Sequence, residues 1–168
     1  MRIAVTGSSK LAGSIVEAFN ATSIRIEQDI NYNDFDIFIN CAHVGFEQCN
    51  LLYNWFSAWR YDDSKFIINV SSRAGLPNLS KGYLYGAQKA ALDHLADNLT
   101  YNSDKKCKIT TLCLGMLEDE LPSLKYSEVS KVINYLLNQP KNIEVPRMYL
   151  QHLHNYQEIQ QLKESRYK

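Results

Sequence analysis

Short apolar runs alternate with amphipathic helical patterns along this chain, and this alternation restricts its fold more than any other feature. The runs that predict strands are residues 3–6, 24–26, 36–42, 66–70 and 109–114, with a last strand expected at 143–150. Apolar side chains at helical spacing predict helices between them, at 11–19, 46–60, 85–101 and 127–138. Strands that alternate with helices form a parallel sheet covered on both faces. We therefore expect an α/β fold, a doubly wound parallel sheet in three layers, αβα.

The connection between the second and third predicted strands is too short for an ordinary crossover. Residues 29–35 alone join them, whereas a parallel crossover usually needs about a dozen residues or more. No helix fits into that length, so we expect a reduced number of strands on this side of the sheet. The sequence has no repeat and no low-complexity linker. It predicts a single domain over residues 1–154 and a polar C-terminal tail over 155–168.

The overall composition argues against several classes of partner. The 18 basic and 18 acidic residues of this 168-residue chain cancel, so neither nucleic acid nor an anionic membrane is expected as the main partner. No apolar run approaches the roughly 20 residues of a membrane span. The chain starts on a predicted strand without a leader, which predicts a cytoplasmic protein. The cysteines lack metal-type spacing, so we expect reduced thiols and no metal site.

A glycine-containing turn connects the first predicted strand to the first helix. It reads Thr6-Gly7-Ser8-Ser9-Lys10-Leu11-Ala12-Gly13. In this position, backbone N–H groups and the helix N-terminus can face a pyrophosphate. Ser8 and Ser9 would add hydroxyl donors, and Lys10 would add positive charge. An ordinary strand–helix turn is the alternative, but the place directly after the first strand favours phosphate binding.

A serine, a tyrosine and a lysine form the grouping with the most chemical content. Ser72 follows a buried strand, and Tyr85 and Lys89 lie one turn apart at the start of a long helix, with Gly86 leaving room for a ligand. A free tyrosine has a pKa of about 10, and a cation on the same helix face favours the phenolate. Such a pair can exchange a proton with a carbonyl or alcohol oxygen.

The Tyr-x-x-x-Lys spacing has little weight by itself. It also occurs at Tyr61/Lys65, in a polar turn, and at Tyr101/Lys105, at the end of a helix. Only the pair that begins at Tyr85 opens a long amphipathic helix after a strand that ends in serine. The surroundings, rather than the spacing, therefore indicate a functional site.

These segments together resemble the short-chain dehydrogenase/reductase family. The matching motifs follow the family's order over residues 1 to 150: Thr6–Gly13, Asn40-Cys41-Ala42-His43, Asn69-Val70-Ser71-Ser72, Tyr85–Lys89 and Leu114-Gly115. Leu11 stands where the family has its middle glycine, His43 where it has a glycine and Leu114 where it has a proline. Asp119 stands near the family's carboxamide-binding threonine. The resemblance implies a Rossmann-like NAD(P)-binding domain, unusually short for this family.

The resemblance also implies a nicotinamide cofactor, NADP or NAD. The residues that would contact it are Gly7, Ser8, Ser9, Lys10, Leu11, Gly13, Asp29, Asn40, Cys41, Ala42, His43, Tyr85, Lys89 and Gly115. Lys10 resembles the basic loop residue of NADP-preferring members. Asp29 resembles the acid with which NAD-preferring members hold the ribose hydroxyls. Between the two cofactors we favour NADP.

The catalytic roles follow from the same resemblance. Tyr85 would be the general acid/base, Lys89 would favour its phenolate and hold the nicotinamide ribose, and Ser72 would orient the substrate oxygen. Ser71 is the neighbouring alternative, but only Ser72 stands at the right distance from Gly75 for the family's Ser-x-x-Gly pattern.

The helix expected at 46–60 carries two further expectations. A relay asparagine is expected there, at Asn50, with Asn54 as the alternative. Trp55 and Trp59 lie one turn apart and would either fill the core or form a dimer interface. By resemblance, we expect a homodimer or a higher homo-oligomer.

The expected function is hydride transfer between a nicotinamide cofactor and a small carbonyl or alcohol substrate. Residues 118–126 lead directly into the next helix, so we expect no substrate lid and an open site lined by the loop 73–84. The alternative is a catalytically idle dinucleotide-binding or regulatory protein on the same fold.

Overall fold

The computed structural model describes residues 1–77, 82–117, 122–153, 161, 164 and 165, and within them one wholly parallel sheet. The strand order is β2-β1-β3-β4-β5-β6. The strands are β1 (Ile3–Thr6), β2 (Thr22–Ile24), β3 (Ile37–Asn40), β4 (Phe66–Ser72), β5 (Lys108–Leu114) and β6 (Arg147–Leu150). From β1 the chain winds first to one edge and then, from β3, to the other. The doubly wound α/β prediction is confirmed.

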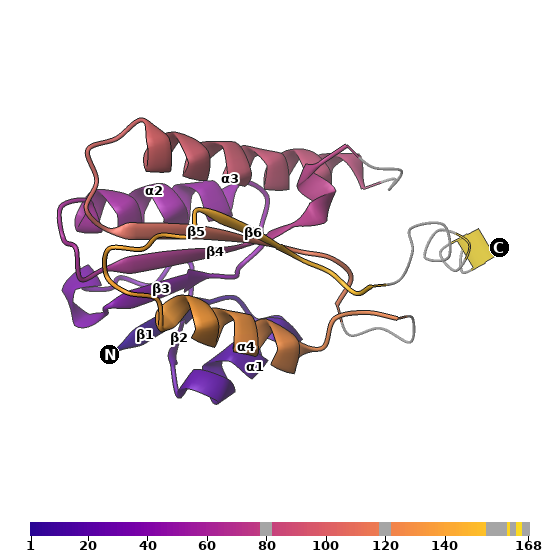
Figure 1. Ribbon diagram of the computed structural model, residues 1–168, viewed down its shortest axis with the longest axis horizontal. Helices are drawn as coiled ribbons and strands as arrows, with labels where there is room; N and C mark the ends of the chain where they lie inside the picture. Colours follow the sequence, from indigo (N-terminus) through magenta and orange to yellow (C-terminus); the bar gives the residue numbers. More distant parts are fainter. Residues whose placement is uncertain (78–81, 118–121, 154–160, 162–163, 166–168) are drawn as a thin grey trace.

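Helices cover both faces of the sheet (Figure 1). They are α1 (Lys10–Phe19), α2 (Glu47–Trp59), α3 (Tyr83–Tyr101) and α4 (Tyr126–Leu137), with short 3-10 helices η1 (Tyr32–Asp34) and η2 (Arg73–Gly75). Strand alternation divides the apolar side chains between the faces. In β3, for example, Ile37 and Ile39 join the core under α1 and α4, while Phe38 joins the core under α2 and α3. This is the expected three-layer αβα arrangement.

The second strand begins and ends two residues earlier than the sequence pattern predicts. The left-handed backbone of Asn20 (φ 48°) ends α1 and turns the chain directly into β2. Its register with β1 then runs from Ala4↔Thr22 to Thr6↔Ile24. Because β1 ends at Thr6, Arg25 and Ile26 have no strand to pair with.

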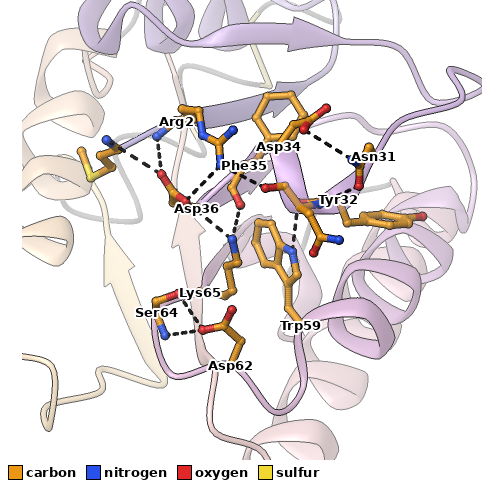
Figure 2. Close-up of polar contacts among 12 residues, drawn as sticks. Arg2, Asn31, Tyr32, Asp34, Phe35, Asp36, Trp59, Asp62, Ser64 and Lys65 are labelled. Atoms are coloured by element: carbon orange, nitrogen blue, oxygen red, sulfur yellow. Dashed lines mark hydrogen bonds and ion pairs between the residues drawn. The ribbon is translucent and has the colours of Figure 1, made fainter.

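A short loop replaces the missing crossover helix between β2 and β3. β2 is an edge strand, on the side where the short connection predicts fewer strands, and η1 is the only helical segment in the return path, which also has a hydrogen-bonded turn at Arg25–Gln28. Figure 2 shows how the loop is anchored. The indole N–H of Trp59 donates to the Tyr32 carbonyl at 3.2 Å, and Lys65 donates to the Phe35 carbonyl at 2.6 Å and pairs with Asp36 at 3.6 Å. These contacts hold the return loop against the end of α2 and the start of β4.

The two tryptophans of α2 belong to the core. Each is 1% exposed, and Trp55 stacks on Phe38 with ring centroids 4.1 Å apart. The Tyr32 ring covers Trp55 edge-on at 4.8 Å. Core burial is therefore the correct alternative for Trp55 and Trp59, and they provide no dimer surface.

Two sequence predictions fall largely on residues that the structure does not describe. Between β5 and α4 the chain has only residues 115–125 for a lid, and 118–121, which include Asp119, lie outside the described part. Of the tail 155–168, only residues 161, 164 and 165 are described. Among the described residues, no helix is long and apolar enough to cross a membrane.

Candidate active site

A cleft of about 830 Å³ lies at the carboxyl ends of the strands and contains most of the sequence-predicted site. Ligands of open α/β sheets bind in this crevice. The predicted residues that line it are Gly7, Ser8, Ser9, Lys10, Leu11, Cys41, Ala42, His43, Ser72, Tyr85, Lys89 and Gly115. Gly13, Asp29, Asn40 and Asn50 are not among its lining residues. The fold therefore brings the glycine turn and the Ser/Tyr/Lys grouping into one site.

Gly7 is required by both backbone conformation and packing. Its φ of 112° is one that residues with a side chain rarely adopt, and a Cβ there would lie 3.2 Å from the backbone N of Ala42. Ser9 then caps α1, its hydroxyl oxygen accepting the Ala12 N–H at 3.2 Å. The N-terminus of α1 thus faces the cleft across a tight turn, as anion binding requires.

The other two positions of the glycine turn differ from the sequence expectation. Leu11 lines the cleft, yet its side chain is 5% exposed because it packs into the core under α1 and α4. A Cβ at Gly13 would meet no heavy atom within 4 Å. Gly13 therefore lies on an open part of α1, and its lack of a side chain serves no close approach.

The residues that follow β2 in the cleft are Arg25, Ile26 and Glu27, and Asp29 is not among them. The reason is the early end of β2 at Ile24, which moves Asp29 further along the return loop. Sequence reasoning missed Arg25 because the strand was placed over it. A correct strand boundary was the signal needed to find it.

Ser72 and Ser71 face opposite layers, as consecutive strand residues must. The Ser72 oxygen accepts the Ala74 N–H at 3.1 Å, which caps η2 and leaves the hydroxyl hydrogen able to donate. Ser71 is 3% exposed and donates to the Asp93 carboxylate at 2.5 Å. Of the two serines, only Ser72 has a hydroxyl with a donor left to offer.

Tyr85 and Lys89 occupy the first turns of α3 with different exposure. Tyr85 is 39% exposed and Lys89 only 4%. The Lys89 ammonium lies 5.6 Å from the centroid of the Tyr85 ring, and it donates to Gln48 Oε1 at 2.7 Å and to the Val70 carbonyl at 3.1 Å. Burial lowers the pKa of Lys89 to about 8. An ammonium has three donors, so one remains beyond these two bonds.

The missing side chain of Gly86 makes room for the backbone of η2 rather than for a ligand. A Cβ there would lie 2.7 Å from the Ala74 carbonyl oxygen. η2 therefore rests directly on α3, and through it the position of Ser72 depends on a helix that also carries Tyr85 and Lys89.

His43 closes one side of the site. Its ring meets the Tyr85 ring edge-on, with centroids 4.8 Å apart. Burial, and then the nearby charge of Lys89, lower the pKa of His43. The imidazole is therefore mainly neutral at pH 7.

Known structures match this architecture, although sequence comparisons do not. Neither family models nor curated proteins match the chain. Serine dehydrogenase from Escherichia coli covers 93% of this chain and 100% of its own at 14% identity, with a TM-score of 0.72. An alcohol dehydrogenase from Thermococcus sibiricus complexed with 5-hydroxy-NADP covers 92% and 98% at 15% identity, with a TM-score of 0.70.

The family to which this fold belongs is named in the description of a third solved structure. It is a short-chain dehydrogenase/reductase from Brucella melitensis, which covers 88% of this chain and 93% of its own at 15% identity, with a TM-score of 0.68. The fold is that of the short-chain dehydrogenases/reductases. At such identities the likeness shows the fold, and the roles of single residues depend on their geometry here.

Within this short-chain dehydrogenase/reductase fold, the structure does not bring the predicted relay asparagine to Lys89. Asn50 is exposed, and its amide donates to the Glu47 carboxylate at 3.1 Å; the alternative, Asn54, is exposed as well. The residue of α2 that reaches Lys89 is Gln48, which is 2% exposed. A polar residue in the apolar stripe of a helix was the available signal, and the sequence reasoning did not use it.

Proposed function

We propose that this protein is an NAD(P)-dependent oxidoreductase that transfers hydride between a nicotinamide cofactor and a small carbonyl or alcohol. The observation that carries the proposal is the meeting of two parts in one cleft: the Gly7–Leu11 turn at the N-terminus of α1, and Ser72, Tyr85 and Lys89. The first is suited to a pyrophosphate and the second to proton transfer. An idle binding protein would need only the first.

The residues in the cleft fit a dinucleotide. The N-terminus of α1 would take the pyrophosphate, and the remaining donor of Lys89 would reach the nicotinamide ribose. At the β2 end, Lys10 and Arg25 would favour the 2′-phosphate of NADP, and Glu27 would oppose it. Two cations against one acid support the preference for NADP. The bound nicotinamide would supply the hydride donor or acceptor.

Ser72, Tyr85 and Lys89 would then handle the proton. The Ser72 hydroxyl, its oxygen already held by the Ala74 N–H, donates to the substrate oxygen and keeps it near Tyr85. Tyr85 gives its proton to the forming alkoxide in reduction and takes one from the alcohol in oxidation. The Lys89 ammonium, 5.6 Å from the centroid of the Tyr85 ring, would stabilise negative charge that develops on the reacting oxygens during this transfer.

The substrate is proposed to be a neutral carbonyl or alcohol with an apolar body. Among the described residues that line the cleft beyond Tyr85 are Val44, Leu117 and Tyr126, and Val44 is 59% exposed. The described charged lining residues other than Lys89 lie at the β2 end. A matched ketone and keto acid of equal size would therefore differ in kcat/KM in favour of the ketone.

The homodimer remains a proposal that sedimentation velocity would test.

Cofactor titration and turnover together test the function. We expect NADPH to bind more tightly than NADH, and Arg25→Ser to reduce this difference. Tyr85→Phe should retain NADPH binding and lose about 100-fold or more in turnover on a panel of carbonyls, the usual scale of general acid–base catalysis. Turnover by Tyr85→Phe at the wild-type rate would refute the role of Tyr85. Binding without turnover by the wild type would favour the idle alternative, and binding of neither cofactor would refute both.

A further inference from the structure

We propose that Gln48 is the positioning residue that holds the Lys89 ammonium in the cleft, and that it connects this ammonium to the ends of β3 and β4. The proposal deepens the proposed function, since Lys89 acts on Tyr85 and on the cofactor. Gln48 itself acts only through Lys89.

Each polar atom of the Gln48 side chain has a partner. Its Nε2 donates to the Asn40 carbonyl at 2.8 Å and to the Val70 carbonyl at 2.9 Å, and its Oε1 accepts from Lys89 at 2.7 Å. Both carbonyls can only accept, so the NH2 group must face them and the oxygen must face Lys89. The orientation of the amide is thus determined by its surroundings, which are buried: Gln48 is 2% exposed.

The place of Gln48 in the sheet explains why it can hold a cation. The β3–β4 ladder has its last pair at Asn40↔Asn69, and Gln48 bridges one carbonyl from each strand at that point. Val70 O also accepts from Lys89, so Gln48, Lys89 and this carbonyl form a closed triangle. The side-chain amide of Asn40 in turn donates to the backbone carbonyl of Gln48 at 2.9 Å. Within this buried network every polar atom of the Gln48 side chain is bonded, which restricts the ammonium to one position.

The other groups around Lys89 do not replace Gln48 as an acceptor. The titratable groups that act on its charge are Cys41 directly after β3, Cys49 from α2, Cys113 from β5 and Asp93 from its own helix. His43 and Tyr85 lie beside it in the cleft. Burial raises the pKa of Cys41 to about 11 and that of Cys113 to about 12, so neither is an anion at neutral pH. Asp93 is occupied by Ser71 and by an ion pair with Arg147 at 3.9 Å. Gln48 therefore provides the bond to the ammonium without adding charge.

The first test uses the wild-type protein without cofactor, so it needs neither a variant nor turnover. The Lys89 side chain is titrated by NMR, and the Gln48 side-chain amide signals are followed through the same pH range. We expect the amide signals to shift with the midpoint of Lys89, because deprotonation weakens the bond to Gln48 Oε1. Amide signals that stay constant through the Lys89 titration would overturn the proposal.

Two near-isosteric variants should then shift the pKa of Lys89 in opposite directions. Gln48→Met removes the acceptor and should lower the pKa of Lys89 by on the order of one unit, the value of one hydrogen bond to a charged group. Gln48→Glu places a carboxylate beside the ammonium and should raise the pKa of Lys89. The alkaline limb of kcat/KM should move in the same directions. A purely structural role would lower the melting temperature of both variants and leave the Lys89 titration in place.

Ser57→Ala is the matched control, since Ser57 is exposed on the same helix and bonds only to the Tyr53 carbonyl among its described contacts. It should leave the Lys89 titration and kcat/KM unchanged. Failure of the proposed function would show as absent turnover in the wild type. Failure of this inference would show in the NMR titration, which does not depend on turnover.

Discussion

The burial of Lys89 predicts an unusual dependence of stability on pH. Lys89 is 4% exposed, and burial lowers its pKa from 10.5 to about 8. Between these two values the unfolded chain holds a proton on Lys89 that the folded chain has released. Stability increases with pH wherever the unfolded state binds more protons. The contribution of Lys89 is therefore least favourable below about pH 8 and improves up to about pH 10.5.

The size of the effect follows from the shift. A difference between 10.5 and about 8 corresponds to about 3 kcal/mol, at roughly 1.4 kcal/mol for each pKa unit. Lys89→Met removes this titration but leaves Gln48 Oε1 without its donor, whereas Val70 O keeps the bond from Gln48 Nε2. That loss costs about 1–3 kcal/mol at every pH. The quantity to measure is therefore how the difference in unfolding free energy between the two proteins changes with pH, and not its value at one pH.

The assay is urea unfolding of wild type and Lys89→Met at intervals from pH 7 to pH 10.5. We expect the difference in unfolding free energy to move by about 3 kcal/mol in favour of the wild type across this range. The cysteines titrate in both proteins and cancel to first order. Lys106→Met, which replaces an exposed lysine, is the control and should give a constant difference.

Two outcomes would refute the reasoning. A wild-type advantage over Lys89→Met that stays constant with pH would mean that Lys89 keeps an ordinary pKa in the folded state. An advantage that decreases with pH would mean that the protein stabilises the ammonium more than water does, which would reverse the sign of the burial effect.

Three further substitutions test the contact between η2 and α3, the predicted relay asparagine and the anchor of the return loop. Gly86→Ala should lower both the melting temperature and kcat, because its Cβ would lie 2.7 Å from the Ala74 carbonyl oxygen and displace η2. Its control is Ala87→Gly, at the exposed next position, which should cost only about 1 kcal/mol of helix stability. Asn50→Ala should change kcat/KM less than twofold, since this side chain is exposed and bonds to Glu47, and a tenfold loss would restore it as the relay. Trp59→Phe should reduce the free energy of unfolding in urea by about 1–3 kcal/mol, because it removes the indole N–H that donates to the Tyr32 carbonyl. An unchanged stability would show that this bond of the loop anchor in Figure 2 contributes nothing.

The fold was largely predictable because its signals are local. Helix and strand periodicities lie within each segment, and the short connection after the second strand was enough to predict a reduced number of strands on that side and a missing helix. The boundary of β2 was not predictable in this way. It depends on where β1 ends, at Thr6, and on the left-handed turn at Asn20. That one boundary decides that Arg25 lies in the cleft and that Asp29 does not.

The sequence by itself determined the α/β architecture, the turn after β1 and the place of Tyr85 and Lys89 at the start of one helix, because each depends on patterns that lie within a segment or follow in order along the chain. Only the tertiary structure decided which polar residue of α2 meets Lys89. Gln48 and Asn50 are both amides on the same helix, and the rotation of that helix against the sheet buries one and exposes the other. The same rotation buries Trp55 and Trp59 in the core. The apolar stripe of α2 indicates that Gln48 faces the core, but the group that it meets there depends on packing between segments far apart in the chain.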